Sequence, residues 1–550
     1  MPTVSAHVAA TLARHIDHVF GVMGNGNAYF LDALERSTDV GYTAVRHEAG
    51  GVVAADAYHR AGGGLAAATA TYGAGFTNTL TALAEAVQAH VPLVLVVGDE
   101  PTSGPRPWDV DQIAMASAVG ARTYTVGRAD AAATTVIAIE HALTYRVPTV
   151  LAIPYDVAAL EAGPVPDAPE PRLPGPTAPR GPFAEQAVRD VARALAGAKR
   201  PLLLAGRGAW IAGAGEALGH LADATGAVTA STALGRGIFP RPESDLGVTG
   251  GFGAEGAMQL IGQSDVAVVF GASLNQFTMR FGALFAPGTR VFQVDLAPAA
   301  THPHVGGFIR GDAAVVARAI TEELGALGAA PSGWRERVDA ASLRVCEPGE
   351  HLAADGRLDP RSAAARIAEL LPEDRVVVSD GGHFIGWANM YWPVASPDRM
   401  MMVGTAFQSI GLGFPSVAGA ALARREATIV LTTGDGGGLM ALADLESAVR
   451  VARGRGLAVV WNDAAYGAEV NLYGLKGLAE APMLIPEVDF AALARGFGAE
   501  GVVVRTLDDL ERLAEWARQP ASDRPFLLLD LRISGTVIAP YQQEIIRVNS

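Results

Sequence analysis

One stretch constrains the fold of this chain more than any other: a glycine-rich run around an acid, Gly434-Asp435-Gly436-Gly437-Gly438, followed later by Asn462-Asp463. Short apolar runs precede both, at 427–431 and 457–461, and leucines recur at helical spacing between them. This pattern predicts a strand, a turn, a helix and a second parallel strand. Because parallel strands of such a unit end at the same edge of the sheet, we expect Asp435 and Asp463 to converge there.

Converging oxygen ligands beside glycines predict a socket for a metal-bound diphosphate. Mg²⁺ prefers oxygen ligands at about 2.1 Å and usually keeps phosphate oxygens in its shell. Glycines expose backbone N–H groups at a helix N-terminus, which favours anions. The alternative interpretation is a glycine-rich turn in which Asp435 only caps the following helix.

The spacing of this stretch resembles the signature of thiamine diphosphate-dependent enzymes, which begins Gly-Asp-Gly and ends in Asn-Asn or Asn-Asp. The resemblance implies thiamine diphosphate and Mg²⁺ as cofactors. It implies that Asp435 and Asp463 give side-chain oxygens to the metal and that Ala465 gives its carbonyl. The remaining cofactor-binding residues that it implies in these loops are Gly434, Gly436, Gly437, Asn462, which would brace the loop, and Tyr466.

A catalytic acid is implied near the N-terminus, where an extended segment ends at Glu48 and an Ala-rich helix follows. Arg-His-Glu-Ala at this place resembles the catalytic glutamate motif of the family, and the turn at 72–78 resembles its Gly-Pro-Gly-Ala-Thr-Asn loop, which adds Gly75 and Asn78 to the cofactor site. In the family a buried Glu bonds the pyrimidine N1′, and the resulting imine deprotonates C2 to give a ylid. We therefore expect Glu48 to be catalytic, although a lone acid is more often a helix cap or a surface charge.

Two further segments resemble cofactor loops of the family. In Gln408-Ser409-Ile410-Gly411, Ile410 corresponds to the apolar wedge beneath the two bent rings, and Gln408 to the carbonyl that accepts from the pyrimidine amine. The segment 380–384 resembles the upstream diphosphate loop and adds Gly382, His383 and Phe384, with His383 as a phosphate donor. Isolated isoleucines are more often core residues, and a lone histidine more often satisfies a local backbone group.

Length and composition suit a large enzyme without nucleic-acid or membrane partners. The 550 residues suggest about three domains of ~150 residues each. The net charge of −15 argues against a general surface for nucleic acid or anionic membranes. Cys346 is the only cysteine, the first residues lack a signal-peptide pattern, and apolar runs such as 91–97 are strand-sized. We therefore expect a cytoplasmic protein.

Strand-like and helical patterns alternate along the chain, which predicts an α/β protein with three doubly wound parallel-sheet domains. Prolines crowd one stretch that cannot form a helix or a central strand. The order of domains resembles that of the family. The expected parts are a pyrimidine-binding domain at 1–162, a Pro-rich linker at 163–182, a central domain at 183–330, a connector with one helix at 331–356, and a diphosphate-binding domain at 357–550.

Glu48 and Asp435 lie in different expected domains, yet both would touch one cofactor. In the family the first domain of one subunit meets the third domain of its partner. The resemblance therefore implies a homodimer, or a homotetramer of paired dimers, with active sites at the subunit interface.

The central domain leaves other interpretations open. Gly206-Arg207-Gly208 after a strand invites a nicotinamide-dependent dehydrogenase, but Ile211 stands where the third glycine is required. Related enzymes sometimes bind FAD or ADP in this domain, and the sequence does not choose between either and neither. A catalytically inactive thiamine diphosphate-binding protein is a further alternative, which would be expected to lose Glu48.

The overall pattern is most similar to acetolactate synthase, which decarboxylates a 2-keto acid and ligates the resulting enamine to a second one. The chain departs from that pattern, since Pro107-Trp108 stands in place of a Phe-Gln pair. Asn25 replaces the acid of pyruvate decarboxylases, and no His-His pair exists. Asp111-Gln112 resembles 2-hydroxyacyl-CoA lyases, without a basic cluster for CoA. A lyase of that kind and a non-ligating 2-keto acid decarboxylase remain alternatives.

Several residues are candidates for the substrate site. Trp387 and Tyr391 recur at helical spacing, and Trp108 joins them as a wall for a bulky acyl group, together with Asn25 and Gln112; packing between domains is the alternative for the aromatic residues. Glu469 aligns with an acid that lies above the thiazolium in pyruvate decarboxylases. In a desolvated place its raised pKa would suit proton transfer, whereas the alternative is a solvated helix acid.

Overall fold

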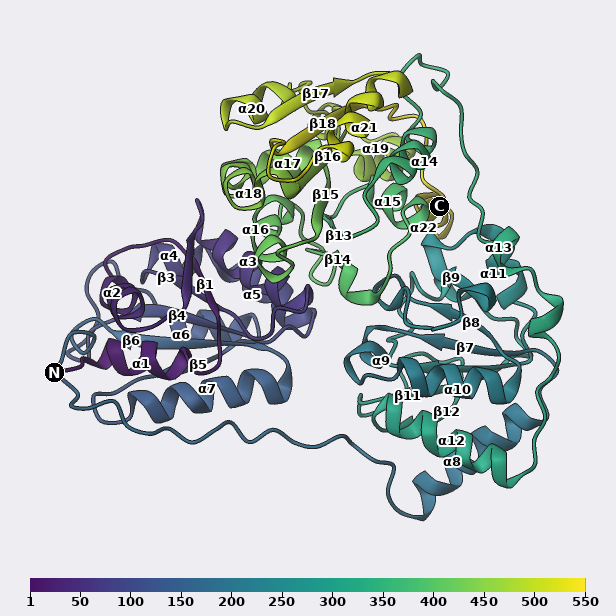
Figure 1. Ribbon diagram of the computed structural model, residues 1–550, viewed down its shortest axis with the longest axis horizontal. Helices are drawn as coiled ribbons and strands as arrows, with labels where there is room; N and C mark the ends of the chain where they lie inside the picture. Colours follow the sequence, from purple (N-terminus) through teal and green to yellow (C-terminus); the bar gives the residue numbers. More distant parts are fainter. Residues whose placement is uncertain (550) are drawn as a thin grey trace.

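The computed structural model describes residues 1–549 and contains three α/β domains, each built on a parallel six-stranded sheet (Figure 1). The predicted fold class is confirmed. The strand orders are β2-β1-β3-β4-β6-β5, β12-β11-β10-β7-β8-β9 and β14-β13-β15-β16-β18-β17. Helices cover both faces of each sheet, so the central strands are mostly apolar, and β4 and β15 are buried at every position.

The first domain lies at the left of Figure 1. Its strands are β1 (His18–Gly21), β2 (Gly41–Ala44), β3 (Ala67–Ala70), β4 (Leu93–Asp99), β5 (Arg122–Thr125) and β6 (Pro148–Pro154). Its helices are α1 (Val4–Leu12), α2 (Ala28–Ser37), α3 (Glu48–Arg60), α4 (Ala74–Thr77), α5 (Leu80–Gln88), α6 (Gln112–Ala118) and α7 (Ala131–Tyr145).

The central domain follows a proline-rich segment that has no helix or strand between 163 and 181. Its strands are β7 (Pro201–Ala205), β8 (Val228–Ser231), β9 (Asp245–Val248), β10 (Val266–Phe270), β11 (Arg290–Asp295) and β12 (Val305–Arg310). Its helices are α8 (Pro182–Ala196), α9 (Arg207–Ile211), α10 (Gly215–Thr225), α11 (Glu255–Ile261) and α12 (Ala313–Ala326). The connector beyond it holds only a 3₁₀ turn, Arg335–Arg337, and the four-residue α13 (Ala340–Leu343), so its expected helix is short.

The third domain lies at the top of Figure 1. Its strands are β13 (Arg375–Ser379), β14 (Met400–Met402), β15 (Thr428–Gly434), β16 (Gly456–Asn462), β17 (Glu500–Val504) and β18 (Leu527–Arg532). Its helices are α14 (Pro360–Leu370), α15 (Ile385–Tyr391), α16 (Gly413–Ala423), α17 (Asp435–Met440), α18 (Leu445–Ala452), α19 (Gly467–Tyr473), α20 (Phe490–Gly496), α21 (Glu511–Arg518) and α22 (Pro540–Asn549).

Helices α3 and α16 join the first domain to the third, and one hydrophobic core runs through both. Their closest approach is at Gly419, where a Cβ atom would lie 1.9 Å from the carbonyl oxygen of Ala54. A glycine is therefore required for the two helices to pack at this distance.

A buried ion cluster reinforces this junction. Arg60 on α3 pairs with Asp56 at 2.6 Å and with Glu85 on α5 at 3.2 Å. Arg60 also donates to the carbonyl of Met402, and Glu85 accepts from the backbone N–H of Phe407. The cluster thus binds the first domain to the loop that precedes the segment 408–411.

No helix within residues 1–549 combines the length and the apolar character needed to cross a membrane.

Candidate functional site

The candidate site lies at the carboxyl edge of the third sheet. Gly434 at the end of β15 pairs in parallel register with Trp461 near the end of β16. Asp435 begins α17 directly after β15, and Asp463 follows β16 by one residue. The two carboxylates therefore share one edge, as the strand–turn–helix pattern requires.

The pKa values of both carboxyl groups are raised above the ordinary value of an aspartate. Burial, with the nearby charge of Asp463, raises the pKa of Asp435 to about 7, and burial raises the pKa of Asp463 to about 6. The Oδ2 atom of Asp435 is buried and has no hydrogen-bond partner among residues 1–549. Because a buried carboxylate needs a partner, this pair fits a cation.

The donor set suits a metal that takes further oxygens from a ligand. Nowhere in residues 1–549 do three His, Cys, Asp or Glu side chains come together as metal ligands. The Asp463 loop is instead shaped by its backbone: Ala464 adopts a left-handed φ of 61°, and its carbonyl accepts from Ile485. The carbonyl of Ala465 takes no part in that hydrogen bond. The resemblance to the family predicts this carbonyl as a metal ligand.

Glycines leave bare backbone around the carboxylates. A Cβ atom on Gly436 would lie 2.7 Å from the ring of Tyr466, and one on Gly434 would lie 2.9 Å from Phe384. On Gly437 it would lie 3.0 Å from Oδ2 of Asp380. The cradle therefore has no room for side chains at these positions, and backbone at the start of a helix suits a diphosphate.

The upstream loop packs beside this cradle. Gly382 has a φ of 140°, and His383 is buried edge-on to Trp387 with a centroid distance of 6.2 Å. Burial lowers the pKa of His383 to about 4, so its ring is neutral at neutral pH.

The segment 408–411 reaches the same place. Ile410 is half-buried, and its Cγ2 atom lies 3.1 Å from where a Cβ atom of Gly381 would stand. Gln408 is exposed with a φ of 63°, and its amide donates to the carbonyl of Thr405. The structure thus brings Ile410 to the upstream loop, whereas the Gln408 side chain bonds within its own loop.

Glu48 stands at the start of α3 and accepts from Nδ2 of Asn78 at 2.9 Å. A Cβ atom on Gly75 would lie 3.4 Å from Oε1 of Glu48. The three residues that the sequence assigns to the first domain therefore form one group. In the isolated chain Glu48 is half-exposed rather than buried.

The candidate substrate residues of the first domain gather around Tyr72. Asn25 donates to the Tyr72 hydroxyl at 2.9 Å, and Gln112 accepts from the backbone N–H of Gly73 at 2.7 Å. Trp108 is 62% exposed in the following loop. Gln112 is buried, so it braces the loop rather than lining an open surface.

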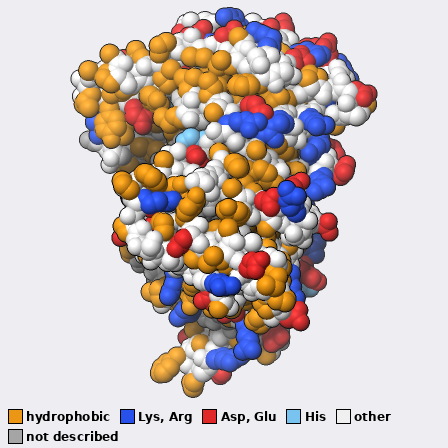
Figure 2. All heavy atoms as spheres, turned by 90° about the vertical axis from the view of Figure 1, so that its left-hand side faces the viewer, with side chains coloured by type: hydrophobic (Ala, Val, Ile, Leu, Met, Phe, Trp, Pro, Cys, Tyr) orange, Lys and Arg blue, Asp and Glu red, His pale blue; other side chains and the backbone are white. Residues whose placement is uncertain are grey.

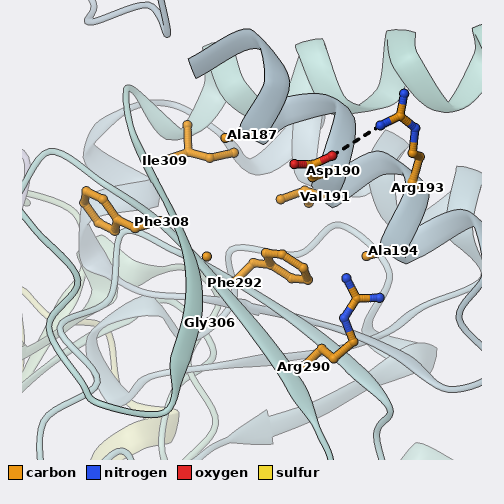
Figure 3. Close-up of a pocket in the computed structure, with 11 residues that line it drawn as sticks. Ala187, Asp190, Val191, Arg193, Ala194, Arg290, Phe292, Gly306, Phe308 and Ile309 are labelled. Carbon is orange, nitrogen blue, oxygen red and sulfur yellow. Dashed lines mark hydrogen bonds and ion pairs between the residues drawn. The ribbon is translucent and has the colours of Figure 1, made fainter. Parts of the chain in front are cut away.

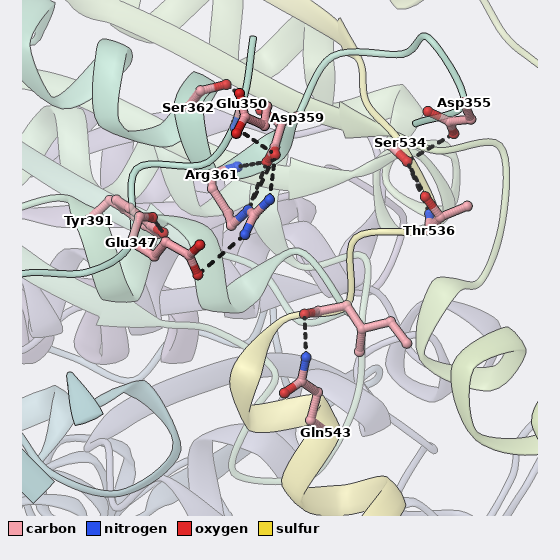
Figure 4. Close-up of polar contacts among 11 residues, drawn as sticks. Glu347, Glu350, Asp355, Asp359, Arg361, Ser362, Tyr391, Ser534, Thr536 and Gln543 are labelled. Carbon is pink, nitrogen blue, oxygen red and sulfur yellow. Dashed lines mark hydrogen bonds and ion pairs between the residues drawn. The ribbon is translucent and has the colours of Figure 1, made fainter. Parts of the chain in front are cut away.

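The other candidates lie apart from this group. Trp387 is fully buried in the core of the third domain, and Tyr391 donates to the carbonyl of Glu347 in the connector (Figure 4). These placements favour the packing interpretation for both. Glu469 lies exposed in the first turn of α19, so the desolvated place expected for it is absent from the isolated chain.

The sequence analysis assigned no role to three residues near the site. Arg106 lies over the ring of Tyr72 at 4.1 Å and pairs with Asp109 at 2.8 Å. Asp380 is buried and accepts from the N–H groups of Gly381, Leu412 and Gly413 and from the hydroxyl of Thr433. Asp530 accepts from the Asn462 amide at 2.9 Å. Each has at least one partner distant in sequence, which spacing does not reveal.

The central domain contains a hollow of about 430 Å³ between α8 and the strands β11 and β12 (Figure 3). Arg193, Arg290 and Phe292 line it, and none of the candidate site residues does. Gly206 and Gly208 serve packing instead, because Cβ atoms there would lie 2.4 Å and 2.9 Å from backbone atoms of Gly271. This accounts for the glycine pair without a dinucleotide.

Three family models match successive parts of the chain. The thiamine pyrophosphate enzyme N-terminal TPP binding domain matches residues 2–115, the central domain of these enzymes matches residues 188–320, and their C-terminal TPP binding domain matches residues 380–529. Together they cover most of the sequence.

Curated relatives match over nearly the whole chain. A probable acetolactate synthase large subunit of Methanocaldococcus jannaschii is 27% identical over 96% of this chain and 91% of its own length. A sulfoacetaldehyde acetyltransferase of Roseovarius nubinhibens is 26% identical over 99% of this chain and 94% of its own length. An acetolactate synthase large subunit of Parasynechococcus marenigrum is 27% identical over 92% and 84%. The chain is therefore a thiamine pyrophosphate-dependent enzyme of the acetolactate synthase and pyruvate decarboxylase-like family.

Proposed function

We propose that this enzyme is a thiamine diphosphate- and Mg²⁺-dependent 2-keto acid decarboxylase and carboligase of the acetolactate synthase type. The observation that carries the metal is the pair of Asp435 and Asp463, in which burial raises both pKa values and Oδ2 of Asp435 has no hydrogen-bond partner within residues 1–549. In this proposal both aspartates and the carbonyl of Ala465 bind Mg²⁺.

The diphosphate would lie on the glycine cradle of Gly434, Gly436 and Gly437, with Gly382, His383 and Phe384 beside it. When bound, thiamine diphosphate supplies a C2 ylid that adds to a carbonyl carbon and takes up the electrons released with CO₂. Ile410 would support the bent cofactor from below, and Asn462 and Tyr466 would hold the loop in shape.

Glu48 would bond the pyrimidine ring and exchange a proton with N1′. Asn78 keeps its carboxylate oriented through the 2.9 Å hydrogen bond. An oriented acid near the reacting nitrogen can contribute about 10²–10⁴-fold to the rate.

The names of the relatives suggest two classes of substrate to test. Some are acetolactate synthases, which favours 2-keto acids, and others are sulfoacetaldehyde acetyltransferases. The deciding experiment measures CO₂ release from a panel of 2-keto acids, and consumption of sulfoacetaldehyde, with thiamine diphosphate and Mg²⁺ present. Release of CO₂ without a ligated product would indicate a simple decarboxylase, and no turnover of any substrate would defeat the proposal.

We place Glu469 as the acid that protonates the product. Glu469→Gln is expected to slow product formation by at least about tenfold while the first release of CO₂ stays near the wild-type rate, because only the later proton transfer loses its donor. Single-turnover measurement of both rates checks this. If both rates match those of the wild type, Glu469 is a solvated helix acid.

We also propose a homodimer or homotetramer with the site at the subunit interface. Glu48 is half-exposed in the single chain, and exposed apolar side chains cluster in the third domain at Met440, Tyr473, Leu475, Leu478 and Leu484. Figure 2 shows apolar side chains gathered on the upper part of one face of the molecule. Covering such surface would desolvate Glu48 and stabilise an assembly.

A further inference from the structure

The C-terminal segment of the described chain lies against the upstream loop of the candidate cofactor site. Beyond β18, Ser534 donates to Asp355 in the connector, and Gln543 donates to the carbonyl of Ile538 (Figure 4). These contacts fix the path of the chain into α22. Ala539 is fully buried, and Tyr541 is only 5% exposed.

The backbone N–H of Ala539 donates to Nε2 of His383 at 3.3 Å. A backbone N–H group can only donate, so Nε2 must be the unprotonated nitrogen of the neutral imidazole. The ring proton therefore lies on Nδ1. No described residue accepts a hydrogen bond from Nδ1.

The Nδ1 atom faces the place where Asp463 and the start of α19 meet. A Cβ atom built on Gly467 would lie 3.3 Å from Nδ1 of His383 and 2.7 Å from Oδ2 of Asp463. The free donor of His383 thus lies beside Gly467 and the proposed metal ligand Asp463.

Tyr541 fixes the backbone of the same loop. Its hydroxyl lies 3.1 Å from the carbonyl oxygen of Gly382 and 2.9 Å from that of His383. Its ring packs against Phe252 and Phe277 of the central domain, with centroid distances of 5.4 Å and 6.4 Å. The C-terminal segment is therefore held by contacts with the central domain as well as with the loop 382–384.

We propose that the C-terminal segment 539–541 is a positioning element of the cofactor site, which sets the tautomer of His383 and presents its Nδ1–H group to the diphosphate. Ala539 selects the nitrogen that carries the proton, and Tyr541 fixes where that nitrogen stands. This inference rests on the proposed binding of the diphosphate by the loop 382–384.

A matched pair of substitutions separates the two ring nitrogens. In His383→Asn the side-chain amide takes the place of Nδ1, and in His383→Gln it takes the place of Nε2. We expect His383→Asn to bind thiamine diphosphate within a few-fold of the wild type. We expect His383→Gln to bind it about tenfold or more weakly, since a hydrogen bond to a charged acceptor is lost. Calorimetry in the presence of Mg²⁺ measures both.

The outcomes distinguish a failure of the tautomer assignment from a failure of the proposed binding of thiamine diphosphate. Equal affinities for the two variants, or tighter binding by His383→Gln, would overturn the tautomer assignment alone. A wild-type protein that does not bind thiamine diphosphate would overturn the proposed function as well.

The tautomer can also be read without cofactor. Nitrogen NMR of histidine-labelled protein, with the His383 signal identified by its loss in His383→Asn, is expected to show a protonated Nδ1 and an unprotonated Nε2. The opposite pattern contradicts the proposal.

Tyr541→Phe tests the second contact, with Tyr145→Phe as the control for an exposed hydroxyl on α7. We expect Tyr541→Phe to weaken thiamine diphosphate binding several-fold with its fold retained by circular dichroism, and the control to bind like the wild type. Unchanged binding in Tyr541→Phe would remove this residue from the proposal.

Discussion

The buried carboxyl group of Asp435 and the partly buried one of Asp463 lie at one edge of the third sheet, and their pKa values contribute to how the metal-free protein responds to pH. The folded pKa values of Asp435 and Asp463, about 7 and about 6, exceed the ordinary value of 3.8. Between 3.8 and about 7 the folded chain therefore binds more protons than the unfolded chain. Stability that these groups contribute at low pH is lost as the pH rises through this window.

We expect the contribution of this pair to the thermal midpoint of the cofactor-free protein to fall as the pH rises across that window, and the stabilisation by Mg²⁺ and thiamine diphosphate to grow in parallel. Calorimetric scans on both sides of the window measure this. In Asp435→Asn the fall should shrink and binding of Mg²⁺ and thiamine diphosphate should weaken at least about tenfold, because one metal ligand is lost. A variant with wild-type binding would show that Asp435 is not a ligand.

Glu48→Gln removes the ionisable group but keeps the hydrogen bond from Asn78. We expect exchange of the cofactor C2 proton to slow by about 10²–10⁴-fold, while binding of thiamine diphosphate falls only modestly. Proton NMR after acid quench follows the exchange. Wild-type exchange in this variant would make Glu48 a structural residue.

At the scale of elements, the contact of α3 with α16 depends on the absence of one side chain. Gly419→Ala would place a Cβ atom 1.9 Å from the Ala54 carbonyl oxygen, so the helices must separate. We expect a loss of about 1–3 kcal/mol in stability, measured as a lower thermal midpoint.

Gly325→Ala on α12 is the matched control, because its Cβ atom would meet no other atom within 4 Å. A helical alanine is favoured over glycine by up to about 1 kcal/mol, so this variant should be neutral or slightly stabilised. Equal midpoints for the two variants would mean that the α3–α16 contact relaxes without cost.

Strands of the third domain were predictable from the sequence where a short local pattern is enough to identify them. The strand before Asp435 and the strand before Asn462 are apolar runs, and their parallel pairing puts both acids at one edge. The Asp380 contacts and the bond between Ala539 and His383 were not predictable, since 156 positions separate the latter pair in sequence. The burial of Trp387 in the core of the third domain was not predictable either. Helical spacing shows that residues share one face of a helix, but it does not show what packs against that face.

For the whole molecule, exposed apolar surface and a half-exposed Glu48 lead to one expectation about assembly. We expect sedimentation at micromolar concentration to show a dimer or tetramer, with activity lost as dilution produces monomers. Substituting Leu475 and Leu478, which are 65% and 53% exposed, by aspartate should shift the protein toward monomer by burying charge in the interface. An active monomer loaded with cofactor would contradict the shared site.

The packing of α3 against α16 also affects when the first domain can finish folding during synthesis. The ribosome makes α3 near the beginning of the chain and α16 only after residue 412, with the entire central domain in between. At about 5–20 residues per second this delay lasts roughly 20–70 s. During that interval the Ala-rich face of α3 stays uncovered on the nascent chain, so the first domain is open to chaperones and to misassembly until the third domain emerges.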